Sequence, residues 1–129
     1  MKIETPISVG ELLDKISILK IKSQKIKDTE KLANVNVELA ELLGVCNKNL
    51  SGYKNAKKMI KELESINLEL WDIEDEIRKE ESKKKFGKEF IALARSVYIT
   101  NDKRFEVKNK INKECGSIIK EEKSYEQYQ

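Results

Sequence analysis

The chain has 129 residues, of which 38% are charged and 39% are hydrophobic, and its formal net charge at pH 7 is +3. This length fits a single domain, residues 1–129, that buries a modest core. The 26 basic side chains are interspersed with 23 acidic ones, so the composition lacks the concentrated positive charge of a nucleic-acid-binding protein. The regular recurrence of apolar residues argues against a disordered chain.

Neither a membrane segment nor a metal motif is visible in the sequence. No apolar stretch approaches the roughly 20 residues that cross a bilayer, and the first residues, MKIETPISVG, lack the apolar core of a signal peptide. We therefore expect a cytoplasmic protein without membrane contact. Cys46 and Cys115 are far apart, no CxxC pair occurs, and histidine is absent, so we expect neither a metal nor a cofactor.

A first helix is predicted to begin at Ser8, which can act as its N-cap, with Glu11 completing a capping box. The apolar residues of its core-facing side are Val9, Leu12, Leu13, Ile16, Leu19 and Ile26. Ile18 and Ile21 fall on the opposite side, among lysines. A helix with two apolar sides needs a second packing partner, either another helix of the chain or a second subunit. Ile18 and Ile21 are therefore candidate residues of an oligomer interface.

Apolar stripes predict further helices over about residues 28–50, 54–82 and 88–114. Asp28 or Thr29 can cap the first of these, and Gly116 is the expected stop of the last. The stripe of the third helix is close to a heptad spacing, which allows coiled-coil-like packing. Residues 117–129 are short and are expected to add one docked helical turn.

No segment shows the two-residue alternation of a strand. Four long helices joined by short connections predict an all-α fold, either an antiparallel helical bundle or a pair of helical hairpins. The two-sided first helix favours a homodimer as the oligomeric state.

Polar residues interrupt the apolar stripes of the third and fourth helices. Asn67 and Glu74 lie at the centre of the third helix's stripe. Asn101, Arg104 and Lys108 point in the inward direction of the fourth. If the two helices fold back antiparallel about a loop near residue 85, Asn67 falls near Arg104. Because an unpaired buried charge is costly, Glu74 is expected to pair with Arg104 or Lys108.

Two interpretations of this polar centre remain open. In the first, the side chains form a closed, fully paired network that fixes helix register and oligomer state. In the second, a solvent-connected pocket lies beside Arg104, where Arg104 and Lys108 bind an anionic group and Glu74 orients it or accepts a proton. Without histidine, an enzyme here would need a carboxylate or a lysine with a shifted pKa.

Other polar and aromatic residues flank the centre. Trp71 and Tyr98 are expected at the rim of the core, with ligand stacking as the alternative. Arg95 and Asp102 project away from the stripe, toward the C-terminal tail or another subunit. The acidic side chains between residues 69 and 76 point several ways, which favours a solvated, lysine-paired face over a metal site.

Several stretches resemble a known family. In chain order they read ISVGELLDKISILKIK, KLANVNVELAELL, LWDIEDEIR, FIALARSVYITNDKR and EEKSY, with Ile111 and Asn112 between the last two. Together they cover nearly the whole chain and resemble a family of short uncharacterised proteins, a domain of unknown function found in bacteria and some phages. Members often occur near genes for surface-polysaccharide and glycosyltransferase chemistry, which implies at most an accessory role.

The resemblance assigns no catalytic role to any residue. The positions of this sequence that match its motifs include Glu11, Asp14, Trp71, Glu74, Asp75, Arg95, Asn101, Asp102, Arg104 and Lys123. Several of them belong to the polar centre that helical periodicity predicts.

The leading hypothesis for function is an accessory or binding module that oligomerises through its long helices, linked to surface-polysaccharide biosynthesis. The alternative is a small all-α enzyme that acts on a phosphorylated or carboxylated metabolite such as a nucleotide-sugar. A third hypothesis is a phage or host adaptor that binds a protein partner through Ile18 and Ile21, which requires an exposed apolar patch there.

Overall fold

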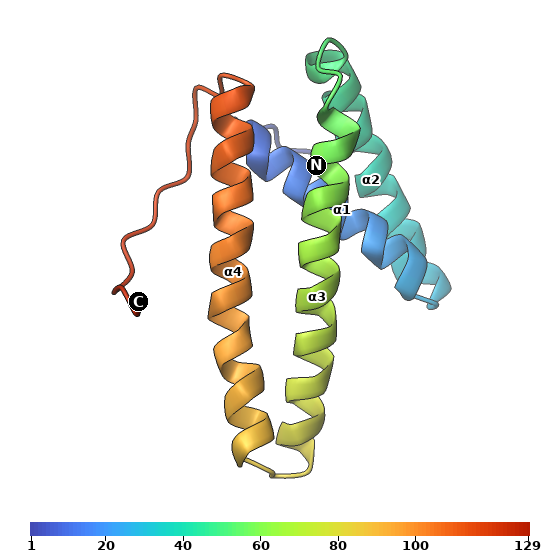
Figure 1. The fold of residues 1–129 in the computed structure, drawn as a ribbon. Helices are drawn as coiled ribbons and strands as arrows, with labels where there is room; N and C mark the ends of the chain where they lie inside the picture. Colours follow the sequence, from blue (N-terminus) through green and yellow to red (C-terminus); the bar gives the residue numbers. More distant parts are fainter.

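The computed structural model describes residues 1–129 as four α-helices without a strand (Figure 1). The helices are α1 (Val9–Lys25), α2 (Thr29–Leu50), α3 (Ala56–Ser82) and α4 (Lys88–Glu114). The predicted all-α fold of four packed helices is confirmed, and only the start of α3 differs, by two residues. None of these helices combines the length and the apolar character that a membrane crossing requires.

The predicted helix ends are confirmed by their capping contacts. The backbone N–H of Glu11 donates to Oγ of Ser8 at 3.1 Å, and that of Lys31 donates to a carboxylate oxygen of Asp28 at 2.9 Å. Gly116 ends α4 in the left-handed region at φ 62°, where glycine has no steric cost. The capping box is not completed, because the carboxylate of Glu11 binds Lys108 instead.

The helices form two hairpins, α1–α2 and α3–α4, and the two hairpins contact each other through α1. α3 and α4 run antiparallel side by side, α1 crosses one half of this pair obliquely, and α2 folds back along α1 (Figure 1). α1 therefore packs against all three other helices. The other half of the α3–α4 hairpin, toward its connecting loop, extends beyond α1, so there the two helices pack only against each other (Figure 1).

The main core lies where α1 meets the end of α2, the start of α3 and the end of α4. Leu13, Ile16 and Leu63 are its most completely buried apolar side chains. Ile21, predicted on the side away from the core, is only 3% exposed, and Ile18 is half-buried. The second packing partner of α1 thus comes from the same chain, and the exposed patch of the adaptor hypothesis does not form at these residues. The homodimer stays a prediction.

The C-terminal tail is extended along α4, so the predicted docked helical turn is wrong (Figure 1). Gly116 turns the chain back, and the short, highly charged segment that follows cannot sustain a helix alone. At its end, the hydroxyl of Tyr128 donates to Asp102, and the ring of Tyr128 meets that of Tyr98 edge-to-face at 5.2 Å. This hydrogen bond, helped by the charge of Asp102, raises the pKa of Tyr128 to about 12. Asp102 thus pairs with the tail, one of the two predicted alternatives.

The crossing of α1 over α4 depends on Gly10. Its backbone N–H donates to Oδ1 of Asn112 at 2.7 Å. A Cβ atom at Gly10 would lie 2.7 Å from the carbonyl oxygen of Lys108 and 3.0 Å from Oδ1 of Asn112. The two helices approach so closely here that only glycine fits.

Gly10→Ala is expected to lower the free energy of unfolding by about 1–3 kcal/mol, because the added methyl group forces α1 and α4 apart. Urea denaturation followed by circular dichroism measures the change. Gly44, inside α2, is the matched control, since a Cβ there meets no atom within 4 Å. Gly44→Ala should raise the free energy of unfolding by up to about 1 kcal/mol. Equal stability of Gly10→Ala and the wild type would contradict the close approach.

Candidate functional site

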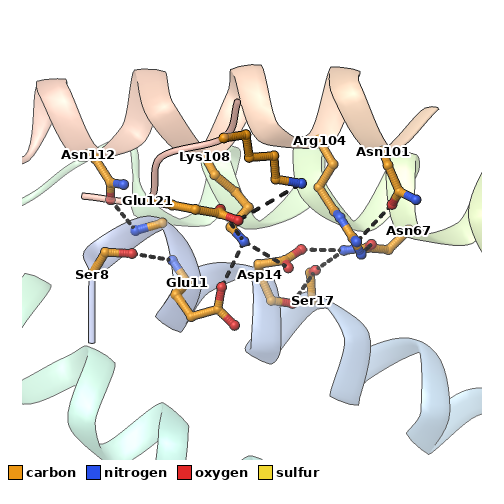
Figure 2. Close-up of polar contacts among 12 residues, drawn as sticks. Ser8, Glu11, Asp14, Ser17, Asn67, Asn101, Arg104, Lys108, Asn112 and Glu121 are labelled. Carbon is orange, nitrogen blue, oxygen red and sulfur yellow. Dashed lines mark hydrogen bonds and ion pairs between the residues drawn. The ribbon is translucent and has the colours of Figure 1, made fainter. Parts of the chain in front are cut away.

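Two polar stripes face each other where α1 crosses α4, and α3 adds one residue between them (Figure 2). The stripe of α1 consists of Ser8, at its N-cap, with Glu11, Asp14 and Ser17 at three-residue intervals. The stripe of α4 consists of Asn101, Arg104, Lys108 and Asn112, at intervals of three and four. The spacing along α4 keeps its side chains on one face of the helix, whereas the row along α1 places successive side chains next to each other and winds around the helix by about 60° per step.

Asn67 of α3 joins the three helices. Its Nδ2 donates to Oδ1 of Asp14 at 2.7 Å and to Oγ of Ser17 at 2.8 Å, and its Oδ1 accepts from Nη1 of Arg104 at 2.9 Å (Figure 2). Asn67 is only 5% exposed, and its bonds to Asp14 and Ser17 are buried, while the bond from Arg104 is partly buried. The contact with Arg104 confirms the predicted antiparallel register of α3 and α4.

Lys108 lies at the centre of a buried ion cluster. Its ammonium group is 2.7 Å from Oε2 of Glu11, 2.9 Å from Oε1 of Glu121 in the tail, and 3.8 Å from Oδ2 of Asp14 (Figure 2). The Lys108 side chain is 8% exposed. The geometry of the Glu121 contact is that of an ion pair and lies outside the range of a good hydrogen bond.

The cluster holds both partners in their charged forms. Burial disfavours the charge on Lys108, but its contacts with Glu11, Glu121 and Asp14 outweigh burial and raise the pKa of Lys108. Burial likewise acts to raise the pKa of Glu11, but the hydrogen bond and the charge of Lys108 prevail and lower it. At this end the charge of Lys108 is paired, although Nδ2 of Asn112, one turn further along α4, is buried without a hydrogen-bond partner.

Arg104, at the other end, has a different environment. Nη1 donates to Asn67, and Nη2 donates to Oδ1 of Asn101 at 2.8 Å, so the direct partners of the guanidinium group are neutral amides. The predicted partner Glu74 instead pairs with Arg78, at 3.1 Å in the same helix. The expected pairing of Glu74 with Arg104 or Lys108 is therefore wrong, because carboxylates of α1 and of the tail take that role for Lys108.

A cavity of about 300 Å³ opens beside Arg104, between α1 and α3. Ile18 and Ile21 of α1 and Leu70 and Trp71 of α3 form its apolar walls. The remaining lining side chains are Lys22, Asn67, Glu74 and Asp75. Ile18, Ile21 and Trp71, predicted for an interface and for the core rim, thus meet at one cavity.

The structure separates residues that the sequence grouped together. Lys108 does not line the cavity and lies in the ion cluster, so it cannot share a ligand with Arg104. Arg95 and Tyr98 are exposed on α4 and lie outside the cavity. No group of three or more acidic or cysteine side chains is arranged to hold a metal ion.

Residues 1–128 match the model of a family of unknown function, DUF6165. The chain belongs to this family. The match covers all but the last residue of this chain, and the description of DUF6165 names no activity and no ligand. No curated protein and no solved structure matches the chain. The chemistry of the site must therefore be argued from its own geometry.

Some residues of the site in this DUF6165 protein were missed by reasoning on helical periodicity. Helical periodicity predicts only a capping role for Glu11, and it predicts no site role for Asp14, Ser17, Asn112 or Glu121. The three-residue spacing of polar side chains along α1 was the available signal, although the apolar stripe beside it concealed that pattern. Glu121 had no such signal, because its partner is in another element.

Asn67→Leu is expected to lower the free energy of unfolding by about 2–4 kcal/mol, because Asp14, Ser17 and Arg104 each lose a buried hydrogen-bond partner. Urea denaturation measures it. Asn49→Leu is the control: the Asn49 amide is exposed and donates only to Val45 of its own helix, so a change within about 0.5 kcal/mol is expected. A similar small effect at Asn67 would show that the network is not stabilising.

The Glu11–Lys108 pair should make stability depend on pH in a defined direction. Glu11 has a lower pKa in the folded state than in the unfolded state, where the pKa of glutamate is about 4.3. Its charge therefore stabilises the fold at pH values above the unfolded pKa, and this contribution is lost as the pH falls through the folded pKa. The raised pKa of Lys108 has the opposite sense, since its contribution is lost only as the pH rises above about 10.

We therefore expect Glu11→Gln to be less stable than the wild type at about pH 6, and the difference to be smaller at about pH 3, which lies below the unfolded pKa of glutamate. Urea denaturation at both pH values measures this difference, and other carboxyl groups cancel in the comparison. A gap of the same size at both pH values would rule out a titrating Glu11 contact.

Proposed function

We propose that this DUF6165 protein is a binding module that holds a small anionic molecule in the cavity between α1 and α3, with Arg104 as the residue that recognises its charge. The observation behind the proposal is the half-buried guanidinium group of Arg104, which lines the cavity and whose direct partners are neutral amides. A cation placed in this way favours an anionic partner from solution.

Arg104 is also held in position before any ligand arrives. Asn67 and Asn101 each accept one N–H group of the guanidinium, which has five in all. The other N–H groups are available to a ligand, and a planar guanidinium binds carboxylate or phosphate oxygens through paired hydrogen bonds. Fixing a side chain in advance lowers the entropy cost of binding.

The surroundings of Arg104 support a binding role over acid–base catalysis. An enzyme that acts on the ligand would need a carboxylate free to exchange a proton beside it. Glu74, which the sequence suggested for this task, forms an exposed ion pair with Arg78, and neither Glu74 nor Asp75, which also line the cavity, contacts the guanidinium group of Arg104. An accessory role in surface-polysaccharide biosynthesis, as the family resemblance implies, is compatible with such a module and forms part of the proposal.

A panel of small carboxylates and phosphate esters tests the proposal, with isothermal titration calorimetry as the readout. At least one compound should bind the wild type, and Arg104→Gln should weaken its affinity about tenfold or more, because a charge-assisted hydrogen bond is lost. Lys103→Gln removes the same charge from an exposed neighbour in α4 and should bind like the wild type. Circular dichroism checks that both variants are folded.

Binding that is equal in Arg104→Gln and the wild type would place the ligand elsewhere. No binding by any compound of the panel at millimolar concentration would reject an anion site at Arg104.

A further inference from the structure

The lining of the cavity also indicates which class of anion it takes. We infer that the ligand is a monocarboxylate with an aromatic body, whose carboxylate binds Arg104 and whose ring lies against Trp71. This inference rests on the proposed function, since it names the ligand of the same cavity.

The walls of the cavity are suited to an apolar body. Ile18 and Ile21 of α1 face Leu70 and Trp71 of α3 across the cavity. The isoleucine and leucine side chains are purely aliphatic, and Trp71 adds an aromatic ring. Asn67 offers a ligand no donor, because both protons of its Nδ2 are engaged within the protein, and its Oδ1 already accepts from Arg104 and keeps only one lone pair. The hydroxyl groups of a sugar would lose their hydrogen bonds to water against such walls, whereas an apolar body would gain from leaving water.

The charges around Arg104 favour a single negative charge on the ligand. The ionic network next to Arg104 contains equal numbers of positive and negative side chains, so the charge of Arg104 is matched by a carboxylate that does not contact it directly. The positive side chains are Arg104, Lys108 and Lys123, and the negative ones are Glu11, Asp14 and Glu121. One carboxylate can pair with the guanidinium group. Lys22, half-buried like Arg104, lines the cavity as well, but so do Glu74 and Asp75, so the two lining cations are already matched by two carboxylates. The second negative charge of a phosphate monoester would therefore add to an excess of negative charge, which disfavours it relative to a single carboxylate.

The size of the cavity also favours a small acid with a single ring. Its volume of about 300 Å³ is at the lower end of small-molecule sites, which range over about 300–1,000 Å³. Because the cavity is open to solvent, a nucleotide-sugar would extend well beyond it, whereas a single ring on a short acidic chain fits within it. Trp71 is half-buried at this cavity and offers an aromatic surface, and aromatic rings pack favourably on one another in offset or edge-to-face arrangements.

Trp71 also provides the readout, because it is the single tryptophan of the chain. Its fluorescence is titrated in the full-length protein with four probes: 3-phenylpropionate, 3-phenylpropionamide, 3-cyclohexylpropionate and glucose 6-phosphate. The expected result is a saturable change with 3-phenylpropionate, at least tenfold weaker binding of the amide, weaker binding of the cyclohexyl acid, and no saturation with the sugar phosphate.

Variants connect this preference to the residues named. Arg104→Gln should remove the advantage of the acid over the amide, while Lys103→Gln should keep it. Trp71→Leu, followed by calorimetry, should reduce the advantage of the phenyl acid over the cyclohexyl acid and leave that of acid over amide.

The other outcomes separate this inference from the proposed function. Arg104-dependent binding of glucose 6-phosphate that is tighter than that of 3-phenylpropionate would overturn the inference and leave the anion site in place. A cyclohexyl acid that binds as tightly as the phenyl acid would overturn the aromatic part. Equal binding of acid and amide, or no Arg104-dependent binding of any anion, would overturn the inference and the proposed function together.

Discussion

The arrangement of the helices depends on hydrogen bonds made by one amide side chain. Asn67 donates to Asp14 and Ser17 of α1 and accepts from Arg104 of α4, so it links three helices at one buried point. Apolar packing alone would allow α1 to slide along the α3–α4 pair, because leucine and isoleucine contacts are not directional. Directional bonds at a buried position fix one crossing point, since any shift would leave polar groups without partners.

From this point the network divides into two ends with different properties. Toward the end of α4, Lys108 is surrounded by carboxylates from α1 and the tail, and its charge is fully paired. Toward the middle of the hairpin, Arg104 is oriented by amides and lines a cavity with apolar walls. The paired end contributes stability and holds the tail, and the open end has the donors that a ligand needs. Of the two interpretations that the sequence left open, the paired network describes the Lys108 half, and the binding pocket is what we propose for the Arg104 half.

Local signals in the sequence were sufficient for the helices and for the α3–α4 register. Ser8, Asp28 and Gly116 act through bonds to residues a few positions away, so their roles follow from spacing alone. Counting from the loop was enough to bring Asn67 to Arg104, because antiparallel helices of equal rise keep their register.

The partners of Lys108 could not be predicted in the same way. Charge balance required a carboxylate near a buried lysine, but it could not distinguish Glu74 from Glu11 or from Glu121, which are distant in sequence. That choice depends on where α1 crosses α4, which is set by the space at Gly10. The cavity could not be predicted from the sequence for the same reason. Its walls come from α1 and α3, and the crossing angle of these two helices leaves no pattern in the sequence of either helix.

The free half of the α3–α4 hairpin has a consequence for how the protein moves. Because only two helices pack there, its amide protons should exchange with solvent through local opening, at a lower free energy than those of the core around Leu63. The connecting loop, around Lys84, is exposed and remote from Arg104, so an inserted peptide or a fused domain would be accommodated at this loop. The hairpin thus separates an exposed tip from the packed helices at its base, and a fluorescent or affinity label placed at the tip would leave the cavity undisturbed.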